Sequence, residues 1–113
     1  MNGNLKRLAS LADMIKEAEL AKLSVAQNKV RVAQDKLRDL QNARTVMNGR
    51  AGIDTAKLAG ADQAWSKWAD MRVRSMNIEI AQAAAQAETG KIAARKAFGR
   101  ASVLQQLASR KSD

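Results

Sequence analysis

Apolar side chains recur along the first half of the chain at alternating steps of three and four residues. From residue 23 onward they stand at Leu23, Ala26, Val30, Ala33, Leu37, Leu40 and Met47, with Arg44 as the single polar interruption. This spacing keeps one side of an α-helix apolar and is typical of the seam of a coiled coil. The pattern predicts one long helix over about residues 5–47.

The first turns of this helix carry large apolar residues in a different phase. We expect the seam there to follow Leu8, Leu11 and Ile15, which makes Ala26 the next seam position, eleven residues beyond Ile15. An eleven-residue step unwinds a left-handed supercoil locally. The sequence therefore predicts a straighter stretch over residues 15–26.

A break containing several glycines follows this helix. It reads Asn48-Gly49-Arg50-Ala51-Gly52-Ile53-Asp54-Thr55, with Gly60-Ala61-Asp62 shortly after. Glycine and asparagine adopt positive φ at low cost and often end helices, and Asp54 and Asp62 are candidate N-caps. We expect a connection over about residues 48–60, with a short helical turn over residues 55–59.

The second half of the chain repeats the three-and-four spacing over about residues 61–110. Its seam positions are Ala69, Val73, Met76, Ile80, Ala83, Ala87, Gly90, Ala94, Ala97, Ala101, Leu104 and Ala108. Small residues dominate from Ala83 onward, which lets two helix backbones approach closely. Two helices of similar length, each with one seam, predict an all-α fold: a single antiparallel coiled-coil hairpin over residues 1–113.

The second helix carries another apolar stripe. At 100° per residue its members fall on the side away from the seam, whereas Trp65 lies at the seam edge. These members are Trp68, Met71, Ile78, Ala85 and Ile92. Exposed apolar patches usually mark association sites, so the stripe is a candidate interface with a partner. Two other interpretations stay open: a second copy covers the stripe, or the first helix wraps further around.

The composition argues against catalysis. The 113 residues include 23 alanines but no cysteine, histidine, tyrosine or proline, so there is no disulfide framework, soft metal site or histidine-activated nucleophile. Thr89-Gly90-Lys91-Ile92 lacks the earlier glycine and the hydroxyl of a phosphate-binding loop. The carboxylate pairs Glu17/Glu19 and Asp35/Asp39 are expected to form solvated ion pairs. We expect neither an enzyme nor a cofactor.

The charge favours anionic partners. Twenty Lys and Arg against eleven Asp and Glu give a net charge of +9, and residues 89–112 hold six basic residues and no acid. In a hairpin this segment lies beside Lys6 and Arg7. The cluster fits an acidic protein surface or phosphates, or it is simply a solvated helix face. Without stacking aromatics or a groove-reading motif, no specific nucleic acid is expected. Two alternative functions stay open: a basic accessory protein that contacts nucleic acid non-specifically, and a structural coiled coil that self-associates into a four-helix bundle.

No window of the sequence is apolar enough to span a membrane, and the first residues lack the apolar core of a secretory signal. We expect a soluble, cytosolic protein that does not insert into the membrane.

Together, several of these stretches resemble the FliJ family, the stalk proteins of flagellar type III export, and their YscO-like counterparts in virulence secretion. The matching features are the Leu/Ala-rich helix Leu5–Leu40, then Gly52-Ile53-Asp54-Thr55-Ala56-Lys57-Leu58, then the aromatic pair in Trp65-Ser66-Lys67-Trp68. The resemblance covers most of the chain.

The resemblance implies a cytoplasmic coiled-coil stalk, peripheral to the export apparatus. Its partners would be the hexameric export ATPase, the cytoplasmic domain of the membrane export gate and export chaperones. Residues implied to face the gate are Trp65, Trp68, Met71 and Arg72, with Leu40 and Met47 close by; Ile78 joins them from the apolar stripe. Residues implied to face the ATPase ring are Lys6, Arg7, Arg100, Arg110 and Lys111.

Overall fold

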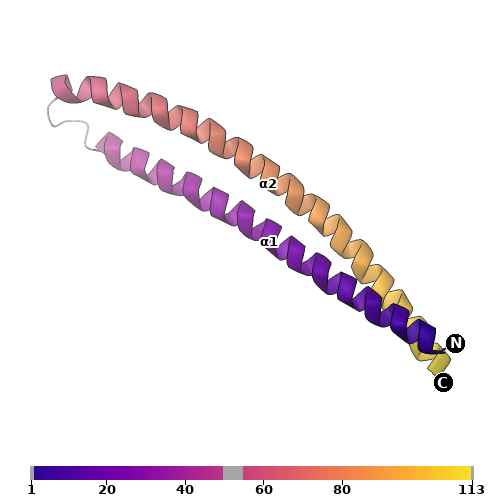
Figure 1. Cartoon of the computed structure of the whole chain (residues 1–113). Helices are drawn as coiled ribbons and strands as arrows, with labels where there is room; N and C mark the ends of the chain where they lie inside the picture. The colour runs from indigo at the N-terminus through magenta and orange to yellow at the C-terminus, as the bar shows by residue number, and fades with distance from the viewer. Residues whose placement is uncertain (1, 50–54, 113) are drawn as a thin grey trace. The chain divides into compact units, whose positions relative to one another are not determined.

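Two long helices make up the computed structural model, which describes residues 2–49 and 55–112 (Figure 1). The first, α1, runs over Asn2–Gly49, and the second, α2, over Thr55–Ser112. No strand occurs in these two ranges. The all-α prediction is confirmed, and both helices extend beyond the predicted bounds.

The connection is shorter than the sequence predicts. The helical turn expected over residues 55–59 is present, but it is the first turn of α2 rather than a separate element. Gly60 and Asp62 therefore lie inside α2, so Asp62 is not an N-cap; Asp54 lies outside the described residues. A single interior glycine costs a helix only about 1 kcal/mol, which is too little to break one of this length.

The chain divides into two units, and each contains a segment of both helices. Unit 1 comprises residues 1–28 and 84–113, and unit 2 comprises residues 29–83. In unit 1 the start of α1, indigo in Figure 1, lies beside the end of α2, drawn in yellow. A helical hairpin, as predicted, is what the structure shows.

Three contacts in unit 1 fix the antiparallel direction. Asp13 accepts a hydrogen bond from Gln105, Lys16 lies over the ring of Phe98, and Leu23 approaches Gly90. Residue numbers rise along α1 while they fall along α2. In unit 2, Arg44 of α1 donates a hydrogen bond to Asp70 of α2 at 2.5 Å, so the polar interruption of the seam is paired.

The predicted seam of α2 is confirmed at every position. All twelve seam residues from Ala69 to Ala108 are buried or half-buried. Among the described residues, the buried core consists of small side chains and one methionine: Ala9, Ala12, Ala69, Met76, Ala87, Ala94, Ala97 and Ala101. Alanine offers little apolar area, so each seam residue stabilises this hairpin far less than a buried leucine would.

The seam of α1 is confirmed over residues 23–47, but its predicted first turns are wrong. Leu8, Leu11 and Ile15 are about half exposed. The inward positions are instead Leu5, Ala9, Ala12, Lys16 and Glu19, all buried or half-buried. These positions continue the alternation of four and three residues without a break. The eleven-residue step is therefore absent, and it gives no reason to expect a straighter stretch over residues 15–26.

Small side chains explain why this phase is preferred. The segment of α2 near Asp13 presents Ala101 and Ala108 on either side of Leu104, and these small residues let the backbones come close where α1 is also small. Ala9 and Ala12 satisfy that condition, whereas Leu8 and Leu11 would hold the helices apart. The uninterrupted phase places Lys16 and Glu19 inward, and both carry ion pairs within α1.

Gly90 marks a close approach between the two helices. A Cβ built at this position would lie 3.4 Å from Leu23 Cδ1 and 3.7 Å from Leu23 Cα, which is ordinary van der Waals contact. At Gly99, by contrast, a Cβ would meet nothing within 4 Å. A methyl group at Gly90 would therefore pack in ordinary contact with Leu23.

Alanine at either glycine should stabilise the hairpin. Each of Gly90→Ala and Gly99→Ala should raise the free energy of unfolding by up to about 1 kcal/mol, because glycine is the poorer helix former by about that amount. Thermal and urea unfolding followed by circular dichroism measure the change. Gly99→Ala reports helix propensity alone, so destabilisation by Gly90→Ala beside a stabilising Gly99→Ala would show that the approach at Leu23 has no room for a methyl group.

Candidate binding surfaces

The outward apolar stripe of α2 is uncovered by the chain itself. In unit 2 its members Trp68, Met71 and Ile78 are 54%, 63% and 59% exposed. In unit 1, Ile92 is also about half exposed. Met71, Ile78, Ala85 and Ile92 stand seven residues apart, at the position of the repeat furthest from the seam. The interpretation in which α1 wraps around to cover the stripe is therefore wrong.

The two tryptophans play different parts. Trp65 is half-buried at the edge of the seam, as predicted. The ring centroids of Trp65 and Trp68 lie 6.4 Å apart with the planes tilted by 44°. This separation is within the range of favourable aromatic pairs, so Trp65 supports one side of the exposed Trp68 ring. The indole most accessible to a partner is thus held by a packed neighbour.

The other residues implied to face the gate separate into two groups. Arg72 is exposed and directly follows Met71 in the sequence of α2. Leu40 and Met47 are half-buried seam residues of α1 and point toward α2. They belong to the packing of unit 2, whereas Trp68, Met71, Ile78 and Arg72 are accessible.

The residues implied to face an ATPase ring all belong to unit 1. Lys6, Arg7, Arg100 and Arg110 are exposed there, and the side chain of Lys111 lies outside the described residues. Among the described residues, none of these four cations forms an ion pair. They are available to an anionic partner.

Unit 1 also contains an apolar groove that the sequence analysis missed. Its volume is about 570 Å³ and its apolar lining comprises Leu8, Leu11, Ala12, Ile15, Val103 and Leu104. Gly99 and three cations, Arg95, Lys96 and Arg100, complete the lining. A second groove of about 450 Å³, lined in part by Leu20, Leu23 and Phe98, also opens in this unit. The sequence contains one sign of the first groove: Leu8, Leu11 and Ile15 do not fall on the seven-residue repeat that the later seam follows.

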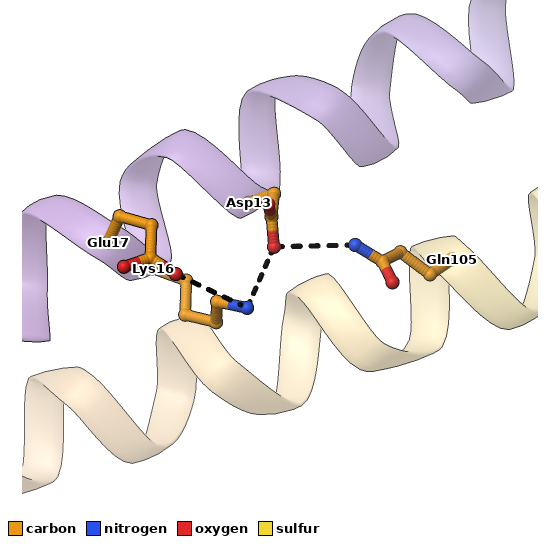
Figure 2. Close-up of polar contacts among 4 residues, drawn as sticks. All are labelled: Asp13, Lys16, Glu17 and Gln105. Atoms are coloured by element: carbon orange, nitrogen blue, oxygen red, sulfur yellow. Dashed lines mark hydrogen bonds and ion pairs between the residues drawn. The ribbon is translucent and has the colours of Figure 1, made fainter.

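A polar cluster joins α1 and α2 in unit 1. Figure 2 shows Asp13 between Lys16 and Gln105, accepting a hydrogen bond from Gln105 Nε2 at 3.3 Å and pairing with Lys16 Nζ at 2.8 Å. Lys16 Nζ also lies 3.6 Å from Glu17 and 5.7 Å from the ring centroid of Phe98. The hydrogen bond to Asp13 raises the pKa of Lys16 above its ordinary value of 10.5, against the opposing effect of desolvation.

Three of the four carboxylates that the sequence predicts to form ion pairs do so in the structure. Glu17, Glu19 and Asp35 pair with Lys16, Lys22 and Arg38, and the last pair is as short as 2.8 Å. The Glu19–Lys22 and Asp35–Arg38 pairs stand three residues apart, and such pairs add a few tenths of a kcal/mol each to a helix. Among the described residues there is no acidic cluster that could hold a metal ion, and no buried side-chain polar atom lacks a partner.

Neither described helix contains a stretch long and apolar enough to cross a membrane. Comparisons with protein-family models, with curated proteins and with solved structures find no match for this chain. The exposed surfaces of the two units are therefore the features that can indicate a function.

Lys16 should make stability sensitive to alkaline pH. Its pKa is higher in the folded than in the unfolded chain, so its contribution is complete below pH 10.5 and is lost as pH rises through the folded value. The melting temperature of the wild type minus that of Lys16→Met should therefore be larger at about pH 8 than at about pH 11.5. Lys22→Met, at an exposed site paired with Glu19, is the control and should show little change. An equal Lys16 difference at both pH values contradicts the expectation.

Proposed function

We propose that this chain is a non-enzymatic hairpin protein that connects partner proteins, and that it serves as a stalk in a bacterial flagellar or type III export apparatus. It lies in the cytoplasm at the periphery of that apparatus, between the hexameric export ATPase and the cytoplasmic domain of the membrane export gate. The single observation that carries the protein-binding part is the exposure of Trp68, Met71 and Ile78 in unit 2.

The physical argument for a partner begins with the size of these side chains. A tryptophan and a methionine one turn apart present a large apolar area to water, and covering that area in an interface is favourable by about 25 cal/mol per Å². Tryptophan is enriched among residues that dominate binding energy at interfaces. Within the hairpin the seam is satisfied without these residues, so their apolar character has no role in packing α2 against α1.

The export assignment is supported by the resemblance of the aromatic pair, the preceding Gly52–Leu58 segment and the Leu/Ala-rich first helix to FliJ-like proteins. The exposed cations Lys6, Arg7, Arg100 and Arg110 fit the expectation of an ATPase-facing surface in unit 1. In this proposal unit 2 binds the export gate and unit 1 binds the export ATPase. Export chaperones are a further class of partner for the same apolar stripe.

Removing the two large side chains should abolish gate binding. The double variant Trp68→Ala/Met71→Ala should bind the purified cytoplasmic domain of the export gate from the same organism at least tenfold more weakly, since each truncation at an interface centre costs about 1–2 kcal/mol or more. Titration calorimetry measures the affinity. Circular dichroism should show nearly unchanged helicity, because both side chains point away from the seam.

Val32→Ala is the matched control, since Val32 is an exposed apolar residue on α1 of the same unit. It should bind like the wild type. Gate binding retained by the double variant would reject the stripe as the gate surface, and a wild type that binds neither gate nor ATPase would reject the export role. Light scattering that shows a wild-type dimer and a monomeric double variant would assign the stripe to self-association instead.

A further inference from the structure

The apolar groove of unit 1 has the features of a helix-binding site with a preference for acidic partners. We propose that it binds an amphipathic helix of another protein, with the apolar face of that helix on Leu8, Leu11 and Ile15 and its acidic flank against Arg95, Lys96 and Arg100. This inference does not rest on the export role, because it is argued from the lining of the groove, which shares only Arg100 with the residues assigned to the export partners.

The floor of the groove matches the spacing of a helix. Leu8, Leu11 and Ile15 follow one side of α1 over two turns, about 10 Å at 1.5 Å per residue. Val103 and Leu104 add apolar surface from α2. A bound helix presents anchors three, four and seven residues apart, so consecutive turns of the partner meet consecutive turns of the floor.

These leucines and the isoleucine have no other structural use. The seam of unit 1 is made by Ala9 and Ala12 on this part of α1, and Leu8, Leu11 and Ile15 stay about half exposed. A groove of about 570 Å³ with such a lining would shed its water favourably when an apolar face enters it. The described residues leave one side of the groove open to solvent.

Charge selects the flank of the incoming helix. Arg95, Lys96 and Arg100 line the groove, no acidic residue lines it, and none of the three cations has a carboxylate partner among the described residues. A helix with glutamates beside its apolar face would supply the missing partners. A second copy of this chain fits less well, because each copy carries a net charge of +9.

Gly99 gives the partner room to approach. It lies between these cations in the sequence, lines the groove and has open space where a Cβ would stand. Nothing in the chain itself requires a glycine there, and glycine weakens a helix interior. A bare stretch of backbone is what a close-packed partner helix would use. Phosphate binding would use the cations but leave the apolar floor unexplained.

A designed peptide tests the proposal with the full-length protein. The probe is a fluorescein-labelled 18-residue helix with leucines at steps of three and four and glutamates beside them; the matched peptide has lysine at every glutamate (about five turns of helix each). Fluorescence anisotropy should show saturable binding of the acidic peptide and at least tenfold weaker binding of the basic one. Arg100→Glu should narrow this difference between the two peptides, because Arg95 and Lys96 remain in the lining.

Two pairs of variants separate the groove from general effects. Arg100→Glu should weaken acidic-peptide binding, whereas Arg110→Glu, an exposed cation outside the groove lining, should not. Leu11→Ala should weaken it, whereas Val25→Ala, an exposed apolar residue at the same position of the repeat on α1, should not. Trp68→Ala/Met71→Ala should leave peptide binding unchanged, so failure here and failure of the export proposal are distinguishable.

Four results would overturn the inference. The first two are the absence of saturable acidic-peptide binding and an equal loss of that binding in Arg100→Glu and Arg110→Glu. Another is cosedimentation with vesicles containing phosphatidylglycerol that depends on Leu11 while the peptide does not bind, which would assign the groove to a membrane surface. The last is a wild-type dimer, seen by sedimentation, that is lost in Leu11→Ala but persists when the peptide is added. This result would assign the groove to a second copy of the chain.

Discussion

Close approach of the two helices through small side chains is the constraint on which the rest of the hairpin depends. In unit 1 the buried residues are all alanines, and Leu23 meets the bare backbone of Gly90. Such a seam gives many short contacts but little buried apolar area per turn. Leu23 fits this seam because Gly90, which it faces, has no side chain. Leu8, Leu11 and Ile15 lie outside the seam and stay about half exposed.

This constraint explains what the sequence predicts well and what it does not. The seam of α2 follows directly from a repeat that holds from Ala69 to Ala108, and Trp68, Met71 and Ile78 follow from it as the opposite face. The prediction for the first turns of α1 is wrong because the largest apolar side chains there do not form the seam. Leu8, Leu11 and Ile15 are larger than Ala9 and Ala12, but the alanines fit the facing surface and keep the repeat continuous.

The bounds of the connection show a related difficulty. Gly60-Ala61-Asp62 resembles a helix start, yet α2 begins at Thr55 and passes through it. Local signals of this kind are worth about 1 kcal/mol and are overridden when both flanking segments are strong helix formers. The groove of unit 1 was not predictable for a different reason. It exists only once the phase of Leu8, Leu11 and Ile15 relative to α2 is known, and no single-helix pattern contains that information.

Polar residues on the seam then specify how the small surfaces are aligned. An alanine seam is nearly uniform along its length, so sliding one helix by a turn of the repeat would cost little apolar contact. The link from Asp13 to Lys16 and Gln105, and the pair of Arg44 with Asp70 in unit 2, each fit one alignment of the segments involved. These polar groups are exposed or half-buried, unlike the buried polar positions that fix register in other coiled coils. The alignment matters for binding, because the groove needs Leu11 of α1 opposite Arg100 and Val103 of α2. The same polar contacts that hold the register thus hold together a binding surface to which both helices contribute.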